Sequence, residues 1–182
     1  MKKLINLACI LLFAFSSLYA FDGERKGFIL GGGIGAGFNS NTESFNAFSE
    51  THSRAVFITN FKIGYAPSNT LEIYYTSKVS WWGESDKIFT LGLSAIATTF
   101  YLDNTTETGW FISGGLGITT KAAPFEYTGG TSYGLGLFGG GGYEFSSHWN
   151  LEVDLLYSTI TTEGEIDLDS FGILVTVNFL AF

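Results

Sequence analysis

Sulfur-containing residues and proline are nearly missing from this 182-residue chain, which has one cysteine, one methionine and two prolines. Cys9 and Met1 both fall within the first 20 residues. The rest of the chain has no thiol, which excludes a disulfide, a thiol nucleophile and a cysteine-based metal site in residues 21 to 182.

Basic residues are also scarce, since 9 Lys and Arg stand against 17 Asp and Glu and give a net charge of −8. This balance argues against nucleic acid as a partner, because phosphate contacts need clustered Lys and Arg. After residue 20, no long stretch has the i, i+3, i+4, i+7 spacing of an amphipathic helix. Gly, Phe and Tyr are abundant instead, with 24, 18 and 9 residues.

The first 20 residues have the pattern of a secretory signal peptide. Lys2 and Lys3 form a basic start, residues 4 to 18 are mostly apolar, and Ala20 suits cleavage. Polar residues break the apolar run, and it is too short for a membrane-spanning helix. We expect residues 1 to 20 to be removed, which takes the net charge from −8 to −10 because two lysines leave.

Apolar and polar residues alternate with a period of two along the rest of the chain. Leu71, Ile73 and Tyr75 share one face of residues 70 to 82, while Glu72 and Thr76 share the other. This alternation is typical of a strand with one apolar and one polar face. In residues 87 to 101 the apolar face carries Phe89, Leu91, Leu93, Ala95 and Ala97. Eight such runs occur, at about 27–39, 54–65, 70–82, 87–101, 109–121, 132–145, 150–161 and 169–182.

These runs predict an all-β fold, an eight-stranded antiparallel up-and-down transmembrane β-barrel, formed by residues 21 to 182. Most runs exceed the roughly 9 to 11 residues that a tilted strand needs to cross a bilayer. An even strand number allows closure, and closure follows from the membrane because an open edge in lipid would leave backbone groups unpaired.

The connections predict the orientation of the barrel. Short turns at 66–69, 103–108 and 146–149 alternate with longer loops at Ser40 to His52 and Lys121 to Thr131. Short turns of such barrels face the periplasm, so we expect both termini there and the long loops outside. Aromatic residues near the predicted strand ends suit the lipid–water interface. They are Tyr65, Tyr101, Trp110, Phe145, Trp149 and Phe179 on the periplasmic side, and Trp81, Trp82, Phe89 and Tyr133 outside.

Two segments share one scheme, in which Gly-Tyr and a Ser-containing turn precede Leu-Glu and an alternating strand. They are residues 142 to 157, GYEFSSHWNLEVDLLY, and residues 64 to 77, GYAPSNTLEIYYTS. The first resembles the penultimate hairpin of the small outer-membrane β-barrel family that includes the OmpA transmembrane domain, OmpX and the opacity proteins. The resemblance implies a bacterial outer-membrane location, a monomer, and recognition by the outer-membrane assembly machinery.

The end of the chain departs from this family in one position. The family commonly ends in an aromatic residue with apolar residues at every second place before it. Phe182 and Leu180 fit, whereas Asn178 does not. We therefore expect a bulge or a shifted register in the last strand.

Six ionisable residues fall on the polar faces of the predicted strands and should point into the lumen. An eight-stranded barrel encloses a space that side chains roughly fill, so these groups should form a hydrogen-bonded ionic plug. We expect Lys62 to pair with Glu72 or Glu152, because unpaired buried charge is costly. The six residues are Lys62, Glu72, Lys78, Glu144, Glu152 and Asp154.

No catalytic, cofactor or metal site is indicated by the remaining motifs. Residues 31 to 37 match G-x-G-x-x-A, but a dinucleotide site needs a helix to follow, and glycines on a barrel strand more simply permit close packing. His52 and His148 should lie at opposite ends of the barrel. Only Glu50, His52 and Ser53 could imitate the Ser and His group of an outer-membrane lipid A deacylase, and sequence adjacency does not supply triad geometry.

The sequence therefore predicts a non-enzymatic integral outer-membrane protein with a structural or surface-interaction role. The expected partners are outer-membrane lipid, lipopolysaccharide and an unidentified surface or host ligand. A narrow porin-like channel is the alternative, and a lipid A-modifying enzyme is a weaker one. Candidate contact residues are the aromatic side chains of the long loops. They are Phe45, Phe48, Phe125 and Tyr127.

Overall fold

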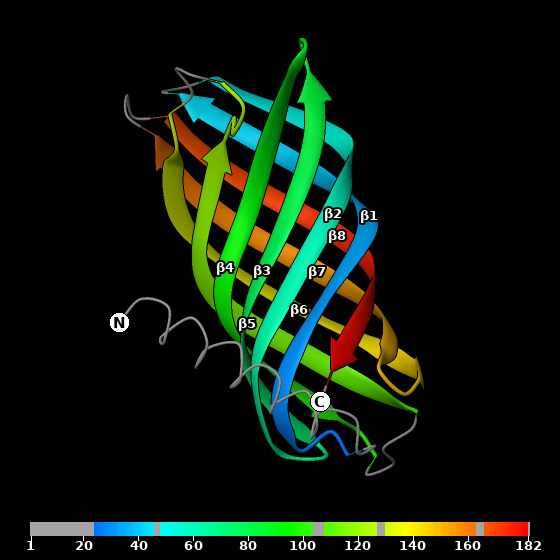
Figure 1. Ribbon diagram of the computed structural model, residues 1–182. Coiled ribbons are helices and arrows are strands. Elements are labelled where there is room, and N and C mark those ends of the chain that lie inside the picture. Colours follow the sequence, from blue (N-terminus) through cyan, green and yellow to red (C-terminus); the bar gives the residue numbers. More distant parts are fainter. Residues whose placement is uncertain (1–23, 46–47, 104–107, 127–129, 163–165, 182) are drawn as a thin grey trace, which may run out of the picture.

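A computed structural model of the protein describes residues 24–45, 48–103, 108–126, 130–162 and 166–181, and these form a closed antiparallel barrel (Figure 1). Each strand pairs with the next, and β8 pairs with β1. The predicted all-β, eight-stranded barrel is confirmed. The strands are β1 (Gly27–Phe45), β2 (Phe48–Ser68), β3 (Leu71–Glu84), β4 (Lys87–Tyr101), β5 (Gly109–Ala122), β6 (Ser132–Ser146), β7 (Trp149–Thr162) and β8 (Ile166–Ala181).

The two ends of the barrel differ. At the terminal end, drawn at the bottom of Figure 1, β1 begins and β8 ends. At the opposite, distal end, β1 and β2 continue well beyond their predicted limits. The predicted loop Ser40 to His52 is therefore wrong: Ser40 pairs with Ser53, and the ladder runs on to Phe45 and Phe48. This extension is rich in Ser, Thr and Asn, so it lacks the apolar face by which the other strands were predicted.

Alternating residues of each strand face outward and inward. The outward residues include large apolar side chains that remain exposed around the barrel, with Leu116 and Leu135 at 74% and 70% exposure. A soluble protein rarely exposes so much contiguous apolar surface. Within the described ranges, no helix has the length and apolar character needed to span a membrane.

Glycines on the inward face of β1 and β6 let lumen side chains approach the wall. A Cβ on Gly33 would lie 2.0 Å from Oδ1 of Asn178, and one on Gly140 would lie 2.4 Å from Oδ1 of Asp154. The motif at residues 31 to 37 continues as strand β1 rather than entering a helix. Its glycines therefore serve close packing.

The last strand keeps one register with both neighbours. Its pairing with β7 runs from Ile166 to Phe179, and its pairing with β1 runs to Ala181, without a shift. The expected bulge is wrong for the described part of β8. Asn178 departs from the family pattern because it faces the lumen, where it is 2% exposed and hydrogen-bonded.

Candidate functional site

The lumen of the terminal half is filled by charged and amide side chains. Each of the six ionisable residues named from the sequence lies inside the barrel and is at most 5% exposed. They come from β2, β3, β6 and β7, because the period of two brings every second side chain of each strand inward. Their contacts divide into three groups along the barrel.

The first group, nearest the terminal end, is built around Arg25. Its Nη2 lies 3.1 Å from Oε1 of Glu144, and its Cζ lies 3.8 Å from the ring centroid of Tyr101. The Tyr101 hydroxyl lies 3.0 Å from Oε2 of Glu144 and 3.3 Å from Oε1 of Glu72. Its single proton can be donated to only one of these carboxylates at a time. Tyr101 was expected in the aromatic belt on the periplasmic side, but it is 1% exposed and faces inward.

The second group contains the pair for which the sequence left two partners open. Lys62 Nζ donates to Oε2 of Glu72 at 3.2 Å. The same ammonium lies 4.0 Å from the ring centroid of Tyr74, which adds a cation–π contact. Lys62 is thereby compensated by a carboxylate and an aromatic face in a site without bulk water.

The third group is centred on Lys78. Its Nζ lies 2.7 Å from Oδ2 of Asp154 and 3.4 Å from Oε2 of Glu152. Asn178 Nδ2 donates to Oε2 of Glu152 at 3.1 Å, and Ser113 Oγ donates to its Oε1 at 2.9 Å. The donors to these two acids come from three other strands, β3, β5 and β8. The negative charge of the acids is therefore shared among several donors.

Arg25 is the lumen residue that the sequence reasoning missed. It precedes β1, so strand alternation could not place it, yet its side chain is fully buried. The charge count could have indicated a further buried cation, because the six predicted residues comprise four acids and only two bases. A third buried cation was needed, and the segment just before the first strand supplies it.

Apolar side chains close the lumen on the distal side of this network. On β2, Ile58 follows the polar residues in the distal direction, and on β7 Leu156 follows Asp154. With Leu93 of β4, they belong to one buried cluster of contacting side chains. The other members include Val56, Leu91, Ala95, Phe138, Ile160, Leu168 and Leu174.

The apolar face predicted for β4 supplies part of this cluster, so it faces the lumen. Leu91 and Leu93 are 4% and 1% exposed, whereas Ile96 of the same strand is 64% exposed. Alternation shows that two faces differ, but it does not say which one faces out. Trp82 and Phe89, which were expected in the outer aromatic belt, also face inward and stack at 6.0 Å between ring centroids.

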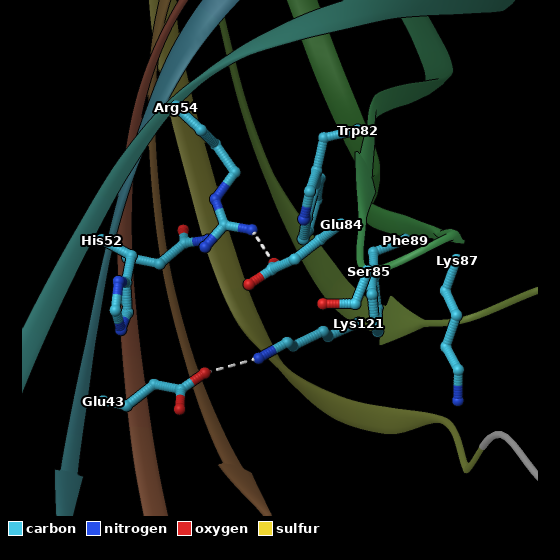
Figure 2. A pocket seen from close by; sticks show the side chains of 10 residues that line it. Glu43, His52, Arg54, Trp82, Glu84, Ser85, Lys87, Phe89 and Lys121 are labelled. Carbon is cyan, nitrogen blue, oxygen red and sulfur yellow. Dashed lines mark hydrogen bonds and ion pairs between the residues drawn. The ribbon is translucent and has the colours of Figure 1, made fainter.

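Beyond the apolar cluster, the distal end is hollowed into a cup of about 400 Å³ (Figure 2). Arg54 of β2 pairs with Glu84 of the neighbouring strand β3, and Lys121 Nζ lies 2.7 Å from Oε1 of Glu43. Glu84 is the last residue of β3 and lies beyond the apolar belt. The hydrogen bond and the charge of Arg54 hold the pKa of the Glu84 carboxyl below its usual value. The cup is lined by Asn41, Glu43, His52, Arg54, Trp82, Glu84, Ser85, Lys87, Phe89 and Lys121.

Comparisons with known proteins support the architecture. No protein-family model matches the sequence, and no curated protein matches it significantly. Among solved structures, Neisserial surface protein A is 15% identical, with a TM-score of 0.53 and coverage of 81% of this chain and 96% of that one. The chain therefore shares the eight-stranded barrel fold of Neisserial surface protein A.

Two further solved structures are more distant. OprG from Pseudomonas aeruginosa is 12% identical, with a TM-score of 0.49 and coverage of 87% of this chain and 98% of that one. Ail, the attachment invasion locus protein of Yersinia pestis, is 10% identical, with a TM-score of 0.48 and coverage of 85% and 99%.

The four aromatic contact candidates are not gathered in two loops. Phe45 and Phe48 end β1 and begin β2, where they pair in register. Phe125 follows β5 and is 70% exposed, which leaves it available for contact. Tyr127 lies outside the described residues.

The barrel does not assemble Glu50, His52 and Ser53 into one group. His52 Nε2 lies 3.3 Å from Oε1 of Glu50, and both side chains are exposed. Ser53, the next residue along the strand, points to the opposite face and donates to Oγ of Ser40 at 3.0 Å. His148 lies in the turn between β6 and β7 at the terminal end. Among the described residues, no three His, Cys, Asp or Glu side chains are placed to hold a metal ion.

Proposed function

We propose that this protein is an integral protein of the bacterial outer membrane that acts by contact at the cell surface and does not conduct ions. Its barrel spans the membrane, its termini face the periplasm, and its distal end faces outward. The observation that carries the membrane placement is the outward apolar surface of a barrel whose strands all pair.

The outward surface matches what lipid requires. Aliphatic side chains such as Leu116, Ile118 and Leu137 cover the middle of the barrel and are more than half exposed. Toward the terminal end, Tyr65 and Trp110 are exposed where the belt ends, and such rings favour the interface. Strands of 14 to 21 residues exceed the length that a bilayer requires.

The shape of the two ends supports this orientation. Turn length does not distinguish them, since two residues separate β2 from β3 at the terminal end and two separate β3 from β4 at the distal end. Strand extension does, because β2 begins nine residues before its ladder with β3 and projects at the distal end. The distal end carries the extended β1–β2 hairpin and the cup, which suits a surface that meets other molecules.

The filled lumen favours a contact role over the channel alternative. An ion that passed the charged groups around Lys78 would meet buried Leu93, Ile58 and Leu156. The described polar groups at this level are neutral hydroxyls, those of Ser80, Thr119 and Ser158. Removing an ion from water without replacement ligands is strongly unfavourable. The opposite directions of Ser53 and His52 give no support to the enzyme alternative.

Cell fractionation tests the membrane placement. The protein should sediment with the outer membrane and migrate faster on gels when left unheated, because a folded barrel stays compact in detergent. Sedimentation with the inner membrane or recovery in the cytosol would overturn the proposal.

Cysteine labelling on intact cells tests the orientation, since the expected mature chain has no other thiol. Ser49→Cys near the distal tip should react with a membrane-impermeant maleimide. Ser147→Cys in a terminal turn should react only after the cells are broken, and the reverse result would invert the orientation. Both side chains are exposed, so the two variants are matched.

Planar-bilayer recording tests the closed lumen. Refolded protein should give no discrete current steps. Reproducible unitary steps from protein shown to be folded by gel mobility would establish the channel alternative instead.

A further inference from the structure

The barrel wall divides at its distal end between β2 and β3. The ladder between these strands begins at Phe57 and Trp81, although β2 starts nine residues earlier and β3 continues to Glu84. A cleft of about 360 Å³ occupies the gap, lined by residues 51 to 55 on one side and 82 to 84 on the other. Figure 1 shows the β3–β4 hairpin rising apart from the tip of β1 and β2.

The cleft and the cup are parts of one cavity system, because they share four lining residues. These residues are His52, Arg54, Trp82 and Glu84. The cup thus opens at the distal end and adjoins a side opening between β2 and β3, which the Arg54–Glu84 ion pair spans. The side opening begins just beyond Trp81, where the paired wall ends.

The cup presents more cations than carboxylates. Arg54, Lys87 and Lys121 line it together with Glu43 and Glu84. The partner of Lys87 is Glu126, at 3.7 Å and outside the lining set. Each of the three cations has one carboxylate partner, so an anionic ligand would share these cations with Glu43, Glu84 and Glu126. The two lining carboxylates can also accept hydrogen bonds from ligand hydroxyl groups.

Trp82 supplies a donor at the base of the cup. The side chain is 8% exposed, and its Nε1 makes no hydrogen bond of normal geometry in the described structure, although the N–H helps to lower the pKa of the Glu84 carboxyl. Figure 2 shows the nitrogen-bearing end of the indole directed into the cup, next to Glu84. A buried N–H without an acceptor is unfavourable, so a ligand acceptor at this point would gain a directed contact.

The aromatic ring of Trp82 is held by its neighbours and is not free to stack. Phe89 lies at 6.0 Å between ring centroids, and the Arg54 guanidinium lies 5.1 Å from the Trp82 ring centroid. This arrangement argues against a ligand that binds through a flat base. It favours one that binds through oxygen atoms.

We propose that the cup binds a phosphorylated sugar. The phosphate contacts Arg54 and Lys121, the indole N–H of Trp82 donates to a ligand oxygen, and Glu43 and Glu84 accept from sugar hydroxyls. The volume of about 400 Å³ lies within the range of small-molecule sites and exceeds what phosphate alone would fill. The sugar can belong to a glycolipid headgroup that enters through the side opening, or to a soluble molecule.

This inference rests on the proposed function only for the statement that the cup faces outward. Binding is measured on refolded protein in micelles. The binding test can therefore fail while the fractionation test succeeds, and the fractionation test can fail while the binding test succeeds. The two proposals therefore have separate tests.

The test is an NMR titration of the indole N–H signals, of which the four tryptophans give four. Trp82→Phe identifies the signal of Trp82 by its loss. Glucose 6-phosphate should shift this signal and saturate, with about tenfold tighter binding than glucose or inorganic phosphate, because each probe lacks one set of contacts. Lys121→Gln should weaken glucose 6-phosphate about tenfold, whereas Lys26→Gln, at the terminal end and exposed, should not.

Each other outcome overturns the proposal. An unmoved Trp82 signal removes the site, equal binding of glucose removes the requirement for charge, and equal binding of inorganic phosphate removes the sugar. Nanodiscs with and without a phosphorylated glycolipid then distinguish the sources. A Trp82 shift caused by the glycolipid alone identifies a headgroup, and a shift caused only by glucose 6-phosphate identifies a soluble ligand.

Discussion

The ammonium group of Lys78 lies 2.7 Å from the carboxylate of Asp154, and the two residues are 76 positions apart in the sequence. Both side chains are almost fully buried, and the same ammonium also compensates Glu152. This cation is therefore the counterion for two acids in the middle of the lumen. Its removal would leave both without their main partner.

Lys78→Met should destabilise the barrel by about 3 to 5 kcal/mol, because breaking a buried ion pair leaves uncompensated charge. Urea unfolding of the refolded protein in micelles measures the change. Adding Asp154→Leu should recover part of the loss, since one of the uncompensated acids is then gone. A cost below that of the exposed control Lys26→Met would show that the lumen charges are compensated in some other way.

Tyr101→Phe should cost about 1.5 to 3 kcal/mol, because the hydroxyl is a buried donor to charged acceptors. Its neighbours Glu144 and Glu72 would then face each other with one donor fewer. Tyr133→Phe is the matched control, since that ring is 64% exposed and its change should stay within about 0.5 kcal/mol. Equal urea midpoints for the two variants would contradict a stabilising role of the Tyr101 hydroxyl.

Leu116→Arg should cost about 2 to 4 kcal/mol in a lipid bilayer, since the side chain lies in the middle of the apolar belt. Phe125→Arg should be nearly neutral, because that equally exposed residue follows β5 and lies outside the belt. The comparison is made by unfolding both variants in phospholipid vesicles. A neutral Leu116→Arg would place this face in water rather than lipid.

Gly33→Ala should destabilise the protein by about 1 to 3 kcal/mol through overpacking. The new Cβ would meet Asn178 Oδ1 at 2.0 Å and the Val177 carbonyl oxygen at 2.6 Å. Gly139→Ala provides a control within the same fold, because a Cβ there has no heavy atom within 4 Å. If both variants unfold at the same urea concentration, close packing does not explain the glycine on β1.

The sequence was sufficient for the barrel but not for the direction of every face. A period of two located all eight strands, since each crosses a region with different surroundings on its two sides. On β4, however, the apolar side carries Leu91 and Leu93 and lines the lumen. Lipid and a dry lumen both favour apolar residues, so composition alone cannot separate them.

The network and the cup show a similar division. Acidic and basic residues on polar strand faces could be placed in the lumen one by one, but Arg25 lies before the first strand and has no alternation to reveal it. The cup depends on Trp82 and Lys121, which come from different strands. Only closure of the barrel brings them to one cavity, and the sequence pattern of neither strand predicts that placement.

The ion pair of Arg25 and Glu144 has a consequence for how the barrel is held together. These residues are separated by 119 positions, and Arg25 belongs to the segment that leads into β1. The contact joins the segment before β1 with strand β6, and β1 and β6 do not pair with each other in the barrel. Arg25 therefore links two sides of the wall through the lumen, a connection that the backbone ladders between neighbouring strands do not supply.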